Sequence, residues 1–204
     1  EIALDKYQTA LTIFEETQDK KNISDALNNL GILYKELEEY RKSLEYYKKS
    51  LEIQKEMNNK AGVAVLLNNI GIIYDLLGDA ENALKSYREA LRYNEELNNA
   101  FAVSYLQHNI ALIYKDIGKY GQAMEYFNRS LVTTKKLNNE QALVYLYHNI
   151  GDLYYLQEKY NTALQYLEKS QQLSKKNELN KVSYENYRLF SKIYAAKGLL
   201  AQAL

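Results

Sequence analysis

Apolar residues recur with helical spacing in short blocks along the chain. In the block that ends at residue 77, the apolar positions are separated alternately by four and three residues: Val63, Leu67, Ile70, Tyr74 and Leu77. This spacing places their side chains on one face of an α-helix. A second block begins after Gly78-Asp79 and ends at Asn98-Asn99. The two blocks together predict an antiparallel pair of helices, each about 18 residues long.

The pattern repeats every 40 residues, because the segment 68–99 has close counterparts at 28–59, 108–139 and 148–179. Such a fixed period is typical of a solenoid, in which stacked units bury one another's apolar faces. We therefore expect an all-α, right-handed solenoid of antiparallel helix pairs, with ten substantial helices and no strands. A single array is expected, with the second helix of an incomplete repeat at 1–19, full repeats at 20–59, 60–99, 100–139 and 140–179, and a truncated repeat at 180–204.

The chain opens and closes in the middle of a repeat, so we expect it to be a fragment of a longer protein. Solenoids normally end in repeats with a polar outer face. Here the terminal positions that would face a neighbouring unit are apolar: Ile2, Leu4, Leu11, Leu199, Leu200, Ala203 and Leu204. We expect self-association through these uncapped ends, either head to tail or about a two-fold axis.

Small residues occupy two columns of the repeat, where they allow close approach of the paired helices. The first-helix column is Gly31, Gly71, Ala111, Gly151 and Ser191, and the second-helix column is Ala3, Ser43, Ala83, Ala123, Ala163 and Ala203. A tyrosine column is expected in the core: Tyr34, Tyr74, Tyr114, Tyr154 and Tyr194. Gly78, Gly118 and Gly198 follow helix ends, where glycine adopts the left-handed conformation without steric cost. Glu38 and Glu158 share that column, and left-handed geometry would cost each about 1 kcal/mol.

These columns resemble the tetratricopeptide repeat. The pattern of that family is matched in the second full repeat by Leu67, Gly71, Tyr74, Ala83, Tyr87 and Ala90. The family's usual proline is missing, and the period of 40 exceeds the common 34 residues. The chain is therefore similar to the long-repeat branch, which includes kinesin light chains, Pins-type spindle adaptors and bacterial Rap-type peptide receptors. Its composition also resembles bacterial arrays that lie upstream of sensor kinases or transcription regulators.

The resemblance implies that the first helices line a concave groove that holds ligands. The matching positions here are Asn29, Asn69, Tyr105, His108, Asn109, Leu112, Lys115, Tyr145, His148, Asn149, Asp152, Tyr155, Arg188 and Lys192. A ladder of asparagines could hold the backbone of an extended peptide, because a carboxamide both donates and accepts hydrogen bonds. The alternative is that each asparagine bonds to an adjacent helix and only orders the stack. Tyr105, Tyr145 and Tyr155 could likewise belong to the groove or to the packing.

The third and fourth repeats form the richest part of this groove. Lys115, Arg188, Lys192 and the two histidines favour an acidic segment or a C-terminal carboxylate as the ligand. His108 and His148 lie one repeat apart, which permits a shared metal ion, but the sequence lacks a supporting ligand cluster. We therefore expect no metal and no cofactor.

The composition excludes several classes of function. The 26 basic and 26 acidic residues balance, so the chain lacks the basic excess expected of a nucleic-acid-binding protein. There is no cysteine, and the longest strongly apolar run, 61–67, is too short to cross a membrane. No catalytic constellation is recognisable, so we do not expect an enzyme. Localisation is not determined by the sequence, although the cytoplasm is favoured over a periplasmic sensor domain.

The leading hypothesis is a peptide- or protein-binding module that acts as the sensing or recruitment part of a larger, bacterial regulatory protein. One alternative is a structural scaffold or oligomerisation array without a peptide ligand. Another is the regulatory part of a Rap-like phosphatase, which would require a catalytic helix bundle in addition.

Overall fold

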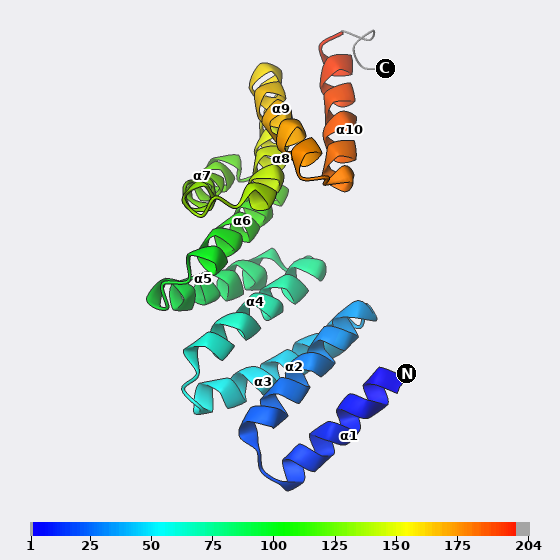
Figure 1. The fold of residues 1–204 in the computed structure, drawn as a ribbon, viewed down its shortest axis with the longest axis vertical. Helices are drawn as coiled ribbons and strands as arrows, with labels where there is room; N and C mark the ends of the chain where they lie inside the picture. Colours follow the sequence, from blue (N-terminus) through cyan, green and yellow to red (C-terminus); the bar gives the residue numbers. More distant parts are fainter. Residues whose placement is uncertain (1, 199–204) are drawn as a thin grey trace. The chain divides into compact units, whose positions relative to one another are not determined.

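The computed structural model describes residues 2–198, and this part of the chain contains ten α-helices and no strand (Figure 1). The helices are α1 (Ile2–Glu16), α2 (Lys20–Glu36), α3 (Tyr40–Glu56), α4 (Lys60–Leu76), α5 (Ala80–Glu96), α6 (Ala100–Asp116), α7 (Tyr120–Lys136), α8 (Glu140–Leu156), α9 (Tyr160–Lys176) and α10 (Asn180–Ala196). From α2 onwards each has 17 residues, close to the length expected from the sequence. The expected apolar end at 199–204 lies outside the described residues.

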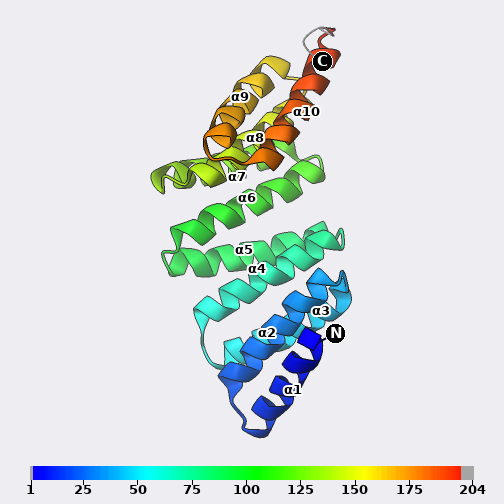
Figure 2. The same cartoon turned by 45° about the vertical axis from the view of Figure 1, so that its right-hand side comes forward.

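The chain divides into two compact units, unit 1 (Glu1–Ala102) and unit 2 (Val103–Leu204). In unit 1, α1 packs against α2, α2 against α3, α3 against α4, and α4 against α5, as Figures 1 and 2 both show. In unit 2, α7 packs against α8, α8 against α9, and α10 against both α8 and α9. The Tyr114 and Tyr126 rings, whose centroids are 5.7 Å apart, join α6 to α7. Helices thus pack mainly against their neighbours in sequence, which confirms the predicted all-α helix-pair fold.

Each pair of consecutive helices is joined by a three-residue turn that closes one helix and opens the next. After α2, Glu39 N–H donates to Tyr34 C=O (2.9 Å) and Glu38 N–H donates to Lys35 C=O (3.0 Å). This pair of bonds is the Schellman motif, which satisfies the last carbonyl groups of the helix. The third turn residue is also the N-cap of the following helix. Where it is Asp or Asn, as at Asp19, Asn59, Asp79 and Asn139, its side chain accepts a bond from the first helical turn.

The middle residue of every such turn has a positive φ. Glu38 (59°) and Glu158 (60°) do adopt the left-handed geometry of the glycine column. The same conformation occurs between repeats, at Gln18, Asn58, Asn98, Asn138 and Glu178, where the sequence contains no glycine. The left-handed residue therefore recurs every 20 residues, once for each helix.

The expected close contact within helix pairs is confirmed by the space around three glycines. A Cβ atom added to Gly31 would lie 2.6 Å from the Tyr47 ring, and one added to Gly71 would lie 2.7 Å from the Tyr87 ring. At Gly151 the corresponding contact is 2.9 Å from Leu167 Cγ. The large side chains opposite these glycines are almost completely buried, so each glycine forms the slot in which its partner packs.

Serine replaces alanine in several second helices, and each serine bonds to the backbone of the paired first helix. Ser43 Oγ donates to Gly31 C=O (2.7 Å), and Ser50 Oγ donates to Ser24 C=O (2.8 Å). Ser130 and Ser170 donate in the same way to Ser104 C=O (2.7 Å) and Val144 C=O (2.9 Å). These serines remain small enough for close packing while their buried hydroxyl groups are satisfied.

The tyrosine column is less uniformly buried than expected. Tyr34 and Tyr114 are buried, whereas Tyr74, Tyr154 and Tyr194 are half-buried. Tyr34 stacks on Tyr46 with centroids 5.2 Å apart, and Tyr154 stacks on Tyr166 at 5.6 Å. The column therefore lies at the margin of the core, where its rings pack against tyrosines of the second helices.

The contact between Gly71 and Tyr87 makes a stability prediction. Gly71→Ala should lower the free energy of unfolding by about 1–3 kcal/mol, because the added methyl group must displace a buried ring. Gly71→Leu should cost more. The matched control is Gly121→Ala in α7, where an added Cβ meets no atom within 4 Å. That control should raise stability by about 0.5–1 kcal/mol, as expected for glycine within a helix. Equal denaturation midpoints for the two alanine variants would contradict the predicted packing.

The turn conformation makes a second prediction. Glu38→Gly should raise the free energy of unfolding by about 1 kcal/mol, because glycine has no Cβ to strain the left-handed backbone. Asn98→Gly should gain less, since asparagine tolerates this conformation better. Urea denaturation of both variants measures the difference, and an equal or larger gain at Asn98 would argue against strain at Glu38.

Candidate functional site

A polar cavity lies between α8 and α10 in unit 2, on helices that are the first members of their repeats. Its lining residues are His148, Asp152, Glu185, Arg188, Leu189 and Lys192, and its volume is about 190 Å³. His148, Asp152, Arg188 and Lys192 were predicted from the sequence to belong to the ligand groove. The structure therefore brings these four together around one cavity.

His148 is held by a chain of hydrogen bonds that begins in the core. Ser170 Oγ donates to Val144 C=O (2.9 Å), so it accepts from Asn186 Nδ2 (3.0 Å). Asn186 is completely buried, and its Oδ1 faces His148 Nδ1 at 2.8 Å. Since Oδ1 can only accept, His148 Nδ1 carries a proton. These bonds fix the orientation of the ring and leave Nε2 as its remaining hydrogen-bonding atom.

His108 is held by a different partner, so the two histidines do not meet. Asn149 Nδ2 lies 2.7 Å from His108 Nε2, which accepts the hydrogen bond. Burial lowers the pKa of His108 to about 4, and the positive charge of Lys115 acts in the same direction. His108 is therefore neutral at physiological pH and joins α6 to α8 as a structural acceptor.

Two ion pairs lie around the cavity. Lys115 Nζ is 2.6 Å from Asp152 Oδ2, and both side chains are largely shielded from solvent. Arg188 Nη1 is 3.0 Å from Glu185 Oε2 in a more exposed pair on α10. Both carboxylates that line the cavity thus have a cationic partner already. Within the described residues Lys192 makes no ion pair, and its side chain is exposed.

The asparagine ladder is partly engaged in bonds between successive first helices. Asn149 bonds to His108 as described, and in unit 1 Asn69 Nδ2 donates to Asn28 Oδ1 (3.2 Å). Asn29 and Asn109 are half-buried, like the other two. Each carboxamide can make several hydrogen bonds, so these contacts leave some of its donors and acceptors available to a ligand. They do show that Asn69 and Asn149 help to order the stack.

The remaining predicted residues differ in their surroundings. Tyr105 and Tyr145 expose 51% and 46% of their surface on α6 and α8, so both rings are accessible. Leu112, which lies on α6, is half-buried. Tyr155 instead packs against Tyr160, with ring centroids 6.1 Å apart, and against the core cluster that contains Leu167 and Ile193. Tyr155 is thus not among the residues that line the cavity, although the cluster it contacts includes the lining residue Leu189.

Sequence reasoning missed Asn186 and Leu189, and it did not select Glu185. Asn186 occupies a column that holds Ala26, Leu66, Leu106 and Leu146 in the other repeats. A polar residue in this otherwise apolar column could have indicated a site, because a buried amide needs a hydrogen-bond partner. That partner, His148, could not be inferred without the packing of α8 against α10.

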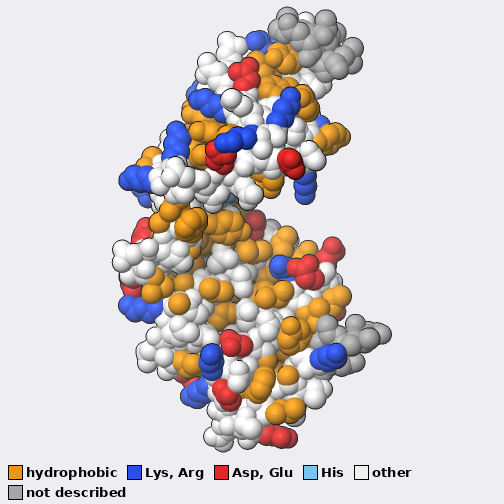
Figure 3. All heavy atoms as spheres, in the orientation of Figure 1, with side chains coloured by type: hydrophobic (Ala, Val, Ile, Leu, Met, Phe, Trp, Pro, Cys, Tyr) orange, Lys and Arg blue, Asp and Glu red, His pale blue; other side chains and the backbone are white. Residues whose placement is uncertain are grey.

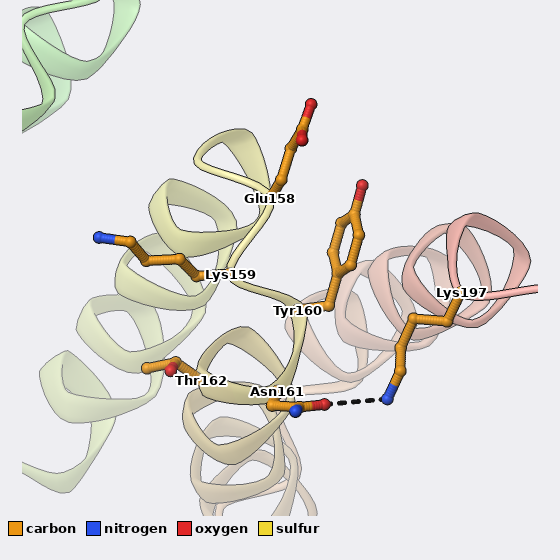
Figure 4. A pocket seen from close by; sticks show the side chains of 6 residues that line it. All are labelled: Glu158, Lys159, Tyr160, Asn161, Thr162 and Lys197. Carbon is orange, nitrogen blue, oxygen red and sulfur yellow. Dashed lines mark hydrogen bonds between the residues drawn. The ribbon is translucent and has the colours of Figure 1, made fainter.

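A larger depression, of about 400 Å³, lies at the start of α9 (Figure 4). It is lined by Glu158, Lys159, Tyr160, Asn161, Thr162 and Lys197, and Lys197 Nζ donates to Asn161 Oδ1 (2.9 Å). The equivalent positions in unit 1, 38–42 and 77, line a similar depression of about 340 Å³. Since its position recurs with the repeat, it follows from the helix-turn geometry rather than from a specific site.

Other site types find no support in the described residues. No cluster of three or more His, Asp or Glu side chains there could hold a metal ion. None of the described helices is long and apolar enough to span a membrane. On the surface drawn in Figure 3, basic and acidic side chains are intermixed, in keeping with the zero net charge.

The burial of His108 makes a prediction about pH. The native state resists protonation until about pH 4, whereas the unfolded chain takes up the proton near pH 6.5. The contribution of His108 to the free energy of unfolding should therefore be fully present above about pH 6.5. It should decline as the pH falls towards 4, by up to roughly 3 kcal/mol. Urea denaturation of the wild type and His108→Gln across this range isolates the contribution, and identical pH profiles would show that His108 is not buried as described.

Comparisons with known proteins agree with this architecture. Solved structures similar to this chain include BtubC from P. vanneervenii (19% identity, 98% of this chain and 85% of that chain, TM-score 0.82). Two others are the apo quorum sensor NprR from B. thuringiensis (20%, 98% and 57%, 0.79) and the STAND protein with a tetratricopeptide repeat sensor from Pyrococcus horikoshii (20%, 93% and 30%, 0.82). At these identities the likeness concerns the fold. No curated protein sequence matches the chain significantly.

The family profile described as tetratricopeptide repeat matches three stretches that together cover most of the chain: 1–56, 22–96 and 101–176. The repeats of this family generally form protein-interaction modules rather than catalytic centres. The chain belongs to the tetratricopeptide repeat family.

Proposed function

We propose that this chain binds an extended peptide or protein segment with acidic groups, and that it serves as the sensing or recruitment part of a larger bacterial regulatory protein. The observation that carries the proposal is the cavity between α8 and α10. There, His148, Arg188 and Lys192 converge, while both lining carboxylates already have cationic partners. An acidic group of the ligand would pair with Lys192 and the exposed part of Arg188.

The rest of the groove in unit 2 supplies contacts of other kinds. Tyr105 and Tyr145 offer exposed aromatic rings on α6 and α8. Asn109 and Asn149 offer carboxamides about one helical turn further along the same helices. Aromatic side chains contribute contact area and amides contribute hydrogen bonds to a peptide backbone, which is a suitable combination for an extended segment.

The regulatory part of the proposal draws on proteins of similar fold. NprR is described as a quorum sensor, and the STAND protein carries its repeats as a sensor. This chain spans 57% and 30% of those two chains, so the output of a larger protein would reside elsewhere. Aspartyl phosphate phosphatase F from Bacillus subtilis also has a similar fold (TM-score 0.80). We assign no catalytic residue to this chain, and the alternative for its context is that it forms the regulatory part of a Rap-like phosphatase or peptide receptor.

A scaffold without a peptide ligand is the second candidate. It is favoured by the bonds between successive first helices, from Asn69 to Asn28 and from Asn149 to His108. If these asparagines serve only the stack, removing them should change stability and leave ligand affinity unaltered.

The test of peptide binding uses fluorescence polarisation with labelled extended peptides that differ in acidic content. Lys192→Ala should weaken binding of an acidic peptide about fivefold, because one exposed charge contact is worth about 1 kcal/mol. The control is Lys135→Ala, which removes an exposed lysine from α7, outside the cavity. Added salt should weaken binding to the wild type more than binding to Lys192→Ala.

The Asn109→Ala, Asn149→Ala double variant separates the two roles of the asparagines, peptide recognition and ordering of the stack. Lower peptide affinity in a folded double variant would place the asparagines in recognition. Unchanged affinity would restrict them to ordering the stack. Failure of every peptide to bind the wild type would remove the proposed function and favour the scaffold.

A further inference from the structure

Unit 1 contains a second cavity whose chemistry is opposite to that of the cavity in unit 2. It lies among α2, α3 and α4 and has a volume of about 250 Å³. None of its lining residues is Lys, Arg or His, and one of them, Asp25, is an exposed carboxylate at the surface of α2. Val65 and Ala61 of α4 supply an apolar wall, and Val65 exposes 56% of its surface.

Gln54 lines this cavity and carries a buried hydrogen-bond acceptor. Ser50 Oγ donates to Ser24 C=O (2.8 Å), so the proton of the Ser24 hydroxyl is directed to Ser50, either to its Oγ (2.8 Å) or to its C=O (3.4 Å). Ser24 Oγ then accepts from Gln54 Nε2 at 2.8 Å. This chain of bonds fixes which way the Gln54 carboxamide points, with its nitrogen towards Ser24 and its oxygen away from it.

In this orientation the Gln54 Oε1 atom has no hydrogen-bond partner. Gln54 is 6% exposed, and its Oε1 atom is buried without a hydrogen bond among the described residues. It lies beside Gly62 of α4, another lining residue, where an added Cβ would collide with it. The Asn59 side-chain nitrogen would lie 3.0 Å from the same added Cβ, so Asn59 borders this point as well. An unsatisfied buried acceptor is costly, and a donor that reaches it is correspondingly favoured.

The N-terminus of α4 does not turn this cavity into an anion site, because its first amide groups are largely occupied. Asn59 accepts from Gly62 N–H through its side chain (3.2 Å) and from Val63 N–H through its carbonyl (3.0 Å). Lys60 N–H donates to Asn58 C=O (3.1 Å). The backbone at the start of α4 therefore offers a ligand few free donors.

The other repeats show that Gln54 and Gly62 belong together. In the later repeats the position of Gln54 holds the smaller residues Asn94, Thr134 and Ser174, and the position of Gly62 then holds Ala102, Ala142 and Val182. Where the incomplete first repeat meets the first full repeat, the two positions hold Phe14 and Asn22. Asn94 satisfies its own amide by donating to Ala90 C=O (2.9 Å). The long amide and the glycine that admits it thus occur together only where the first full repeat meets the second, which is where this cavity lies.

We propose that the cavity in unit 1 binds an alkylammonium group, either a lysine side chain of a partner or a free primary amine. The ammonium donates to Gln54 Oε1 and pairs with the Asp25 carboxylate, while its methylene stem packs on Val65 and Ala61. Entry of the ligand requires the Asn59 side chain to give up its bond to Gly62 N–H (3.2 Å). This site is separate from the cavity in unit 2 and does not depend on peptide binding there.

The test measures binding of N-acetyl-lysine amide to the full chain by calorimetry, with its Nε-acetylated form as the neutral control. Gln54→Met keeps the size of the side chain but removes the acceptor, and should weaken binding about tenfold. Asp25→Asn should weaken it about threefold, because the carboxylate is exposed. Gly62→Ala should also weaken binding, whereas Gly121→Ala in unit 2 should not.

Further probes identify the source of the ammonium group. Equal binding of n-butylamine would support a free amine as a sufficient ligand, and preference for the lysine probe would support a peptide partner. Equal binding of the neutral acetylated probe would overturn the proposal, as would an absence of binding to the wild type. If Gln54→Met or Gly62→Ala lowers the melting temperature strongly, Asp25→Asn still decides the matter, since unchanged affinity there contradicts the ion pair.

Discussion

The contact between a small residue on one helix and a large side chain on its partner is the constraint on which the rest of the structure depends. At Gly31, Gly71 and Gly151 the missing side chain provides the space for Tyr47, Tyr87 and Leu167. This contact sets the separation of the two helices in a pair. It thereby determines which residues of the first helix remain uncovered, and those are the residues available for binding. Packing therefore occupies one face of the first helix and leaves the other face free for the binding that we propose.

The fold could be predicted from the sequence because each structural position occurs in several repeats, so the same residue type can be checked at equivalent positions. A single Gly71 would be ambiguous, but Gly31 and Gly151 at the same position indicate a shared geometric requirement. The left-handed turns at Asn58 and Asn98 were less evident, because asparagine also occurs at helix ends for other reasons. The residues proposed for the groove were selected with the same register.

The candidate site could be predicted only in outline. A column identifies residues on one face, but it does not say which of them bond to each other. His108 and His148 look equivalent in the sequence, yet Asn149 holds the first and Asn186 holds the second. The same limit applies in unit 1, where the unsatisfied oxygen of Gln54 depends on the directions of three hydrogen bonds. Such bonds depend on side-chain conformations that the repeat pattern does not specify.

The three-residue turns have a consequence for how such a chain can change over time. The residues of a turn have fixed roles, because the first ends a helix, the second takes the left-handed conformation, and the third caps the next helix. One added residue would rotate the following helix by about 100°, since an α-helix has 3.6 residues per turn, and would move its apolar face away from the core. Substitutions are therefore tolerated at many positions, whereas small insertions and deletions are not. Arrays of this kind are expected to lengthen and shorten by whole repeats, through duplication or loss of 40-residue units.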